Sequence, residues 1–301
     1  MKPKHWLVFL LLGAIWSSSF MWIKIAVQEI GPVTLVAFRV LFGLLFGVVV
    51  IYIQRIRWPR TLKEWTPLLI LSIANIAIPF FLISWGEQAI DSAVASILNA
   101  TTPLFTILVA HFLLQDDKMT APKVLGLLMG FAGVVILMSK DIGTSLGSVL
   151  GQFAIVLASA FYAGGAVYAR RTTQDLPGIM RSAGPLLPAT VVMWLMMFAV
   201  ESPVKFPQLG ITWIALLFLG VLGSGLAFVM SYYLLHETGP TRTSMVTYLF
   251  PLGGVILGVL FLNEELSWQL VVGAVLIVLS LVVANMQSQK QGQSVKQIAT
   301  D

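Results

Sequence analysis

The stretch Ala93–Asp117, AVASILNATTPLFTILVAHFLLQDD, decides the fold of this chain. It is an apolar run with one proline near its middle and two acidic residues at its end. The same pattern returns at Thr241–Glu265, TRTSMVTYLFPLGGVILGVLFLNEE. A shift of 148 positions pairs Pro103 with Pro251, Ser96 with Ser244, Trp65 with Trp213, Leu68 with Leu216, Leu69 with Leu217 and Phe80 with Phe228. The sequence therefore predicts an internal duplication.

Composition indicates a membrane protein. Hydrophobic residues make up 58% of the 301 residues and charged residues only 10%. The charges cluster in short connectors between apolar runs of about 18–22 residues, the length that crosses a hydrocarbon core of roughly 30 Å. The first run, from Trp6, is too long for a signal peptide and is expected to remain in the protein. No connector is long enough to hold a soluble domain.

The sequence predicts ten spans, at residues 6–27, 33–53, 67–86, 93–113, 122–138, 149–169, 183–200, 211–234, 241–262 and 269–286. With the N-terminus inside, fourteen of the 18 Lys and Arg residues fall in cytoplasmic segments, and only Lys140 and Lys205 in outer loops. This distribution follows the positive-inside rule, so the net charge of +5 reflects topology and implies no nucleic-acid partner. Both termini are expected in the cytoplasm.

Each half has an odd number of spans, so the second half is predicted to cross the membrane upside down relative to the first. The expected organisation is a first repeat at residues 1–141, an inverted second repeat at 142–287 and a disordered cytoplasmic tail at 288–301. Inverted repeats are typical of secondary transporters, whose substrate site lies near the midplane between the halves.

Several features together resemble the EamA-type family of the drug/metabolite transporter superfamily. They are the two five-span halves, the segment Trp16–Phe20 (WSSSF), Arg39 in the second span, and the proline-centred fourth and ninth spans that end in acidic pairs. The resemblance covers residues 6 to about 286. It implies an all-α protein of the cell (inner) membrane with a central cavity. It also implies export of amino acids, related metabolites or toxic compounds, although uptake carriers occur in the superfamily.

A polar stripe on the fourth span is the first candidate for a substrate path. Asn99 and Pro103 are four residues apart and share a helix face with Ser96. Proline leaves the carbonyl of Asn99 without its helical donor, so this carbonyl needs another donor or water. Ser244, Thr247 and Pro251, with Tyr248 beside them, repeat the stripe. We expect both stripes to line the path and both prolines to kink their helices; the alternative is that these small residues only pack helices together.

Aromatic and amide side chains add to this site. The candidates on the first, third, sixth and eighth spans are Trp16, Asn75, Phe80, Tyr162, Phe228 and Tyr232. The resemblance places these four spans, with the fourth and ninth, around the central cavity. Such residues suit a mostly apolar pocket with a few orienting polar groups, although each could instead face lipid or pack in the core.

Lys24, Arg39 and Glu87 are the charges most clearly inside spans. Ionisable groups in a bilayer are costly and mark functional sites or structural pairs. All three are predicted near the outer side, where an Arg39–Glu87 or Lys24–Glu87 pair could gate transport or couple it to an ion. The alternative is that Lys24 and Glu87 reach the interface.

The leading interpretation is a carrier of small metabolites that works by alternating access, as a monomer or a homodimer. The sequence contains no Walker A loop, no cysteine and three widely separated histidines, so we expect no cofactor and no metal site. An intramembrane enzyme would need a nucleophile with its base, which the spans do not supply. A membrane scaffold or sensor is the remaining alternative.

Overall fold

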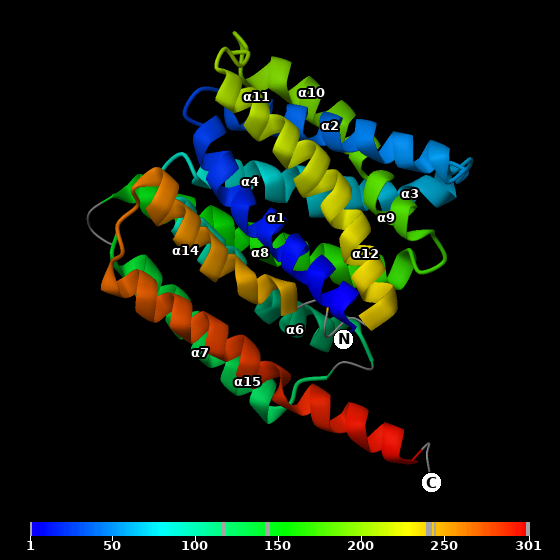
Figure 1. The fold of residues 1–301 in the computed structure, drawn as a ribbon, viewed down its shortest axis with the longest axis vertical. Coiled ribbons are helices and arrows are strands. Elements are labelled where there is room, and N and C mark those ends of the chain that lie inside the picture. Colours follow the sequence, from blue (N-terminus) through cyan, green and yellow to red (C-terminus); the bar gives the residue numbers. More distant parts are fainter. Residues whose placement is uncertain (1, 116–117, 142–144, 239–242, 244, 299–301) are drawn as a thin grey trace.

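A computed structural model describes residues 2–115, 118–141, 145–238, 243 and 245–298, with side chains up to residue 284. Figure 1 shows that this part of the chain is built from helices packed side by side. Ser244 and the Asp116–Asp117 pair lie outside the described residues.

The first half begins with α1 (Pro3–Ala26) and α2 (Pro32–Ile53). A continuous span follows, made of α3 (Leu62–Leu71), the π-helix η1 (Ser72–Ala77) and α4 (Ile78–Gly86). The next span consists of α5 (Ser92–Asn99) and α6 (Thr102–Leu113), and the half ends with α7 (Ala121–Ser139). Prolines stand in the first turn of α1, α2, α6 and α7, where the missing N–H breaks no helical hydrogen bond.

The second half begins with α8 (Leu146–Thr172), α9 (Gly178–Ala183) and α10 (Leu186–Val200). It continues with α11 (Gly210–Leu217), the π-helix η2 (Phe218–Leu226) and α12 (Ala227–Thr238). The 3₁₀-helix η3 (Met245–Tyr248) leads into α14 (Leu249–Leu262), and α15 (Trp268–Ile298) ends the described chain. Adding 148 to the bounds of η1 gives residues 220–225, which lie inside η2.

Nine segments of the described chain, each made of one to three consecutive helical elements, are long and apolar enough to cross a bilayer. The tenth predicted span lies in α15, whose apolar part Trp268–Ala284 is shorter than the other nine. Many large apolar side chains on the outside are exposed, among them Leu45, Leu128 and Leu195. Lipid solvates such side chains, whereas water does not, so the protein is a multi-pass membrane protein.

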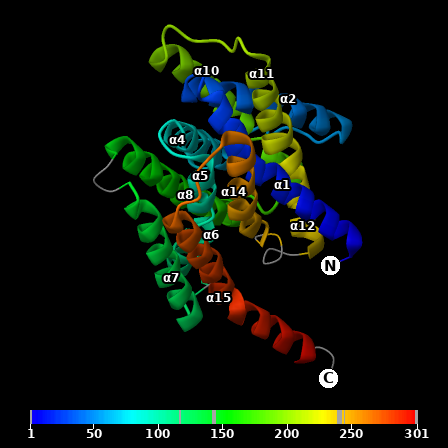
Figure 2. The same cartoon turned by 60° about the vertical axis from the view of Figure 1, so that its left-hand side comes forward.

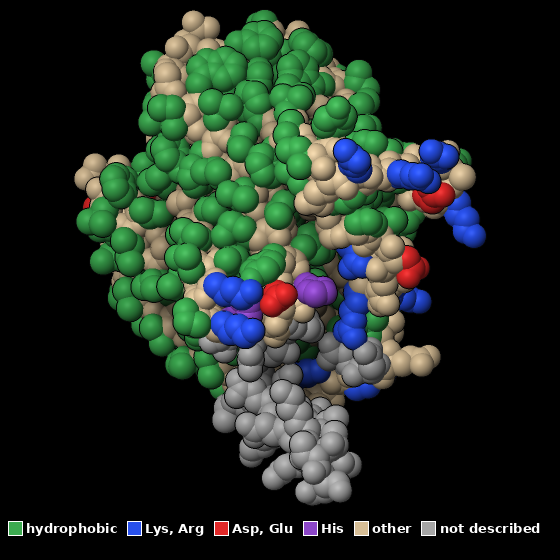
Figure 3. Space-filling model, turned by 45° about the vertical axis from the view of Figure 1, so that its right-hand side comes forward, with side chains coloured by type: hydrophobic (Ala, Val, Ile, Leu, Met, Phe, Trp, Pro, Cys, Tyr) green, Lys and Arg blue, Asp and Glu red, His purple; other side chains and the backbone are tan. Residues whose placement is uncertain are grey.

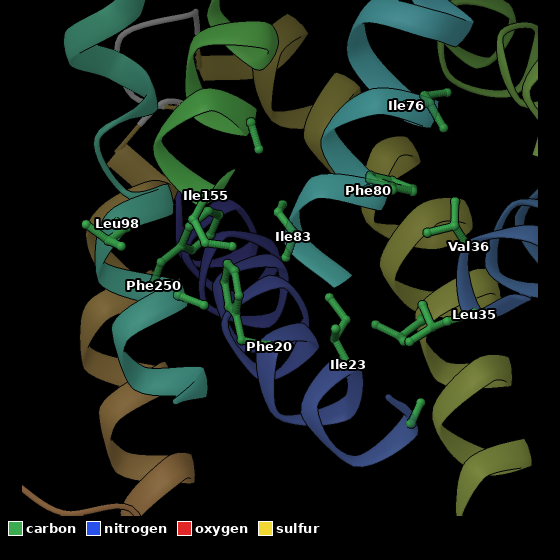
Figure 4. Packing of buried hydrophobic residues seen from close by; sticks show 14 of the residues in the cluster. Phe20, Ile23, Leu35, Val36, Ile76, Phe80, Ile83, Leu98, Ile155 and Phe250 are labelled. Carbon is green, nitrogen blue, oxygen red and sulfur yellow. The ribbon is translucent and has the colours of Figure 1, made fainter. Parts of the chain in front are cut away.

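The core joins both halves. Figure 4 shows buried apolar side chains of α1, α2, η1, α4, α5, α8 and α14 pointing toward one another. Phe20, Leu98 and Ile155 are at most 4% exposed within this cluster. The pair α7 and α15 lies along the edge of the bundle in both ribbon views (Figures 1 and 2). Gly126 and Gly133 of α7 allow close approach, because a Cβ at either position would meet a backbone oxygen of α15 within 3.0 Å.

Charge separates the two ends of the bundle. Figure 3 shows Lys and Arg side chains gathered toward one end of an otherwise mostly apolar face. We call this the basic end and define it by the exposed residues Arg55, Arg57, Arg60, Lys63 and Arg171. The start of α1 and the end of α12 meet there, with His5 Nε2 3.3 Å from Glu237 Oε2. We call the opposite end the acidic end and define it by Glu29, Glu87, Glu201 and Glu264.

Candidate functional site

Arg39 of α2 lies in the interior of the bundle and is only 6% exposed. Its guanidinium carbon stands 3.7 Å from the centre of the Phe80 ring, and its Nε donates a 3.0 Å hydrogen bond to Ser224 Oγ of η2. Among the described residues no carboxylate forms an ion pair with Arg39, and neither Nη group donates a hydrogen bond. Arg39 therefore carries a buried positive charge with unused donors.

The wall beside Arg39 is aromatic. Trp16 Nε1 of α1 donates a 3.1 Å hydrogen bond to the carbonyl of Gly223, which directly precedes the Ser224 that Arg39 contacts. The Trp16 ring meets the edges of Phe228 and Phe250 at centroid distances of 6.0 and 6.1 Å. Trp16 and Arg39, both on helices of the first half, thus bond neighbouring residues of η2 in the second half, and Phe228 packs on Trp16.

Asn75 and Gly165 form a related contact between η1 and α8. A Cβ on Gly165 would lie 2.5 Å from Asn75 Oδ1, so the amide packs directly on the backbone of α8. Tyr162 is partly buried in α8 and lies within electrostatic range of Arg39. The two π-helices are therefore each held by a neighbouring helix: η2 by α1, and η1 by α8.

The fourth span is interrupted just before Pro103. Ala100 and Thr101 form turns with right-handed helical dihedrals, and α6 starts at Thr102, which puts Pro103 in its first turn. The carbonyl of Asn99 accepts a 2.8 Å hydrogen bond from Thr102 Oγ1. The carbonyl of Asn99 thus has a hydrogen-bond partner within the same span.

Ser96 and Asn99 face packed neighbours in this conformation. Ser96 is fully buried and donates a 2.8 Å bond to the carbonyl of Ala93. A Cβ on Gly254 of α14 would lie 2.0 Å from Ser96 Oγ, so the two helices touch at this point. Asn99 is 7% exposed, and its Oδ1 lies 3.4 Å from Ser159 Oγ.

Tyr232 and Tyr248 of the second half have other contacts. Tyr248 Oη donates a 2.9 Å bond to the carbonyl of Leu281 in α15, and Tyr232 packs on Gly178 next to α9. Thr247 is partly buried in η3, and Pro251 is buried in the first turn of α14. The structure thus packs Phe80 on Arg39, places Trp16 with Phe228 on the adjoining Gly223, and gives Tyr232 and Tyr248 other contacts.

Lys24 and Glu87 lie together at the acidic end without an ion pair between them. Lys24 Nζ donates to the carbonyls of Glu87 and Ile90 at 2.8 and 2.7 Å. The Glu87 carboxylate is fully buried, and neither of its oxygens has a hydrogen-bond partner among the described residues. In this conformation Glu87 pairs with neither Lys24 nor Arg39.

The other carboxylates of the acidic end hold helix N-termini of the opposite half. Glu201 accepts hydrogen bonds from Val33 N, Thr34 N and Thr34 Oγ1 at 2.8, 2.9 and 2.7 Å. Glu264 accepts from Ser92 N and Ala93 N at 2.7 and 2.9 Å. A carboxylate at the start of a helix satisfies free N–H groups and opposes the helix dipole.

Glu29 makes the third contact of this kind. It accepts from the N–H groups of Gln208 and Leu209, just before α11. The nearby Thr212 side chain and these two N–H groups lower the pKa of Glu29 below its ordinary value of 4.5. Sequence reasoning marked Glu264 only as the end of a span and missed Glu29 and Glu201, because their partners lie more than 160 residues away.

Fold and site together define a multi-pass helical membrane protein with a buried arginine between its halves. The EamA-like transporter family model matches residues 4–139 and 149–286. This chain belongs to that family, and it is a membrane transporter. The resemblance inferred from its motifs is thus confirmed.

Similar proteins carry the same description. The uncharacterized transporter YoaV of Bacillus subtilis (strain 168) is 24% identical over 265 residues, which are 87% of this chain and 90% of YoaV. The uncharacterized inner membrane transporter YedA of Escherichia coli (strain K12) is 28% identical over 261 residues, covering 85% and 82%. A crystal structure of another protein, 20% identical, matches with a TM-score of 0.70 over 95% of this chain and 99% of its own, which shows a shared fold.

Proposed function

We propose that this transporter carries a small metabolite with a carboxylate group, such as an amino acid or a related compound, out of the cell by alternating access. The observation that supports this substrate class is Arg39, a buried guanidinium with two unused Nη groups. Burying a charge without a partner is costly, so a site of this kind is suited to a ligand of opposite charge.

The chemistry around Arg39 fits a carboxylate better than a cation or a neutral compound. A guanidinium presents its N–H groups in a planar fork that binds both oxygens of a carboxylate. Phe80 and Ser224 already hold the guanidinium in place, so little side-chain freedom is lost on binding. Trp16 and Phe228 supply the apolar surface that orients the rest of a small ligand.

Direction and orientation rest on charge and family resemblance. The exposed Lys and Arg residues of the basic end favour a cytoplasmic location, with both termini inside and the acidic end outside. The name of the similar protein YedA, an inner membrane transporter, supports the inner membrane as the location of this protein. The matching positions of η1 and η2 support two inverted halves that exchange access. The carrier would act without a cofactor, as a monomer or a homodimer, and would catalyse no reaction.

Counterflow in proteoliposomes tests the substrate class. We expect labelled amino acids to exchange, and their amides, which lack the carboxylate, to compete at least tenfold less well. Arg39→Gln should weaken binding about 10–100-fold, because hydrogen bonds to charged groups contribute about 1.5–3 kcal/mol. The exposed arginine variant Arg171→Gln is the matched control.

Two outcomes would contradict this proposal. Equal competition by acids and amides would exclude recognition of the carboxylate, and unchanged binding by Arg39→Gln would exclude Arg39 as the recognising group. Direction is measured separately in vesicles of known orientation, where accumulation on the cytoplasmic side would identify an uptake carrier.

A further inference from the structure

Glu87 is the one acidic-end glutamate in the described chain whose carboxylate has no hydrogen-bond partner. It directly follows α4, and its side chain is 0% exposed. Glu29, Glu201 and Glu264 each accept at least two N–H donors at a helix start. Glu87 therefore differs from the other three glutamates of the acidic end in that its carboxylate is buried without hydrogen-bond donors.

Each charged group near Glu87 is directed elsewhere. Lys24 of α1 is held by the carbonyls of Glu87 and Ile90, and Arg39 of α2 by Phe80 and Ser224. Glu264 brings a second negative charge from the connector before α15. Asp141, which precedes α8, accepts from Gln152 of that helix, and Asp91 precedes α5. Among the described residues no cation forms an ion pair with Glu87. Burial of the carboxylate opposes its negative charge more strongly than Lys24 and Arg39 favour it from a distance.

We propose that Glu87 is a proton-binding site that couples transport to pH: it holds a proton while the acidic end is closed and releases it when that end opens. A fully buried carboxylate without donors is strongly disfavoured as an ion, so the closed conformation favours the neutral acid. The acidic end is closed here, since every residue of α5 and every residue from Val33 to Val40 of α2 is buried.

Opening of the acidic end favours the ionised form of Glu87. When α1 separates from the α4–α5 connector, Lys24 leaves the two carbonyls, and both its ammonium and water can reach Glu87. The carboxylic O–H bond then breaks, the proton passes to water, and the carboxylate that remains pairs with Lys24. Closing the acidic end therefore takes up one proton. The inference adds a coupling ion to the alternating access of the proposed function.

A metal ion fits this place less well than a proton. Sodium needs several oxygen ligands, but Lys24 already occupies the carbonyls of Glu87 and Ile90 and brings a positive charge. The described residues contain no group of three or more acidic or histidine side chains that could hold a metal. A proton needs a single oxygen, which Glu87 provides.

The cysteine-free sequence allows a direct test without substrate. Gln88→Cys and Lys205→Cys place spin labels on exposed acidic-end residues of the two halves. In the purified full-length protein, we expect the ratio of closed to open molecules to change up to about tenfold per pH unit, the limit for one proton. Glu87→Gln, which imitates the neutral acid, should stay closed and lose this pH dependence. Glu264→Gln is the matched control and should keep it.

Infrared spectroscopy provides an independent measurement. The closed form should show the carbonyl band of a protonated carboxylic acid, and Glu87→Gln should lack it. The proposal is overturned if the band survives in Glu87→Gln, if that variant keeps the full pH response, or if sodium at fixed pH shifts the ratio as acid does. Glu87→Asp keeps an acid and should retain a shifted pH response, which identifies a loss caused only by misfolding. None of these measurements depends on the carboxylate substrate, so the two proposals can fail separately.

Discussion

Replacing Gly254 with alanine should push α5 and α14 apart. The added Cβ would lie 2.0 Å from Ser96 Oγ and 2.4 Å from Ser96 Cβ, whereas the next atom, the carbonyl oxygen of Ser92, is at 3.8 Å. Non-bonded carbon atoms prefer roughly 3.5–4.0 Å. Gly254→Ala therefore has to move a helix or a side chain by more than an ångström, and overpacking of this kind costs about 1–3 kcal/mol.

The clash should depend on Ser96 alone. Ser96→Gly removes both offending atoms and by itself should cost about 0.5–1 kcal/mol, the usual penalty for glycine in a helix. In the double variant the space is open, so most of the Gly254→Ala penalty should disappear. Ser96→Ala is the matched control: its Cβ remains 2.4 Å from the new methyl group, so it should restore little.

Thermal unfolding in detergent measures these differences. At about 2–4 °C per kcal/mol, Gly254→Ala should lower Tm by roughly 2–12 °C, with recovery in Gly254→Ala/Ser96→Gly but not in Gly254→Ala/Ser96→Ala. If Gly254→Ala melts like the unmodified protein, Ser96 does not pack against α14 in the population measured. Ser96 would then be free to line a substrate path, as its sequence pattern predicts.

Three further predictions concern contacts that join the two halves. Glu201→Gln keeps one acceptor oxygen for three donors, so the start of α2 should lose about 2 kcal/mol of protection against hydrogen exchange. Exchange of the Val33 and Thr34 amides should then be roughly 30-fold faster. Unchanged exchange would contradict the role of Glu201 as a helix cap. Trp16→Phe keeps the ring but loses the bond to the Gly223 carbonyl, so Tm should fall by an amount equivalent to about 1–3 kcal/mol, and an unaltered Tm would show that another donor takes its place. Because the pKa of Glu29 is lowered in the folded protein, its stabilising contact is present above the ordinary value of 4.5 and is lost as the pH falls through the folded-state value. Exchange at Leu209, corrected for its intrinsic pH dependence, should accelerate only in that acidic range, and acceleration near neutral pH would contradict the assignment.

The number and approximate positions of the spans can be predicted from hydrophobic run length and charge, because both are local properties of the sequence. Nine of the ten predicted spans are found in the described chain as helical segments of membrane-crossing length. The exact form of the broken helices is less accessible. Pro103 indicates a disturbance, but its position, the turns at Ala100 and Thr101, and the bond from Thr102 Oγ1 to the Asn99 carbonyl are seen only in the structure. Pro79 stands in the first turn of α4 directly after η1, but no proline accompanies η2.

In the candidate site, the charged residues can be predicted from the sequence, but their contacts cannot. Lys24, Arg39 and Glu87 are conspicuous in the sequence because charge is rare in apolar spans. Their partners are not visible there: Arg39 contacts Phe80 and Ser224, and Lys24 contacts the backbone of Glu87 rather than its carboxylate. Those choices depend on how helices far apart in the chain are rotated against each other, which a single sequence leaves undetermined.

The π-helices also have a consequence for how length changes are tolerated. A π turn holds more residues than an α turn over a similar rise, so each acts as a one-residue insertion stored inside a span. Removing one residue from η2 can return that stretch to a regular α-helix without shifting α11 or α12 along the membrane normal. The same deletion in α11 or α12 would rotate every later side chain of the span by about 100°. Segments η1 and η2 are therefore sites where one residue can be inserted or deleted while the flanking helices keep their position along the membrane normal.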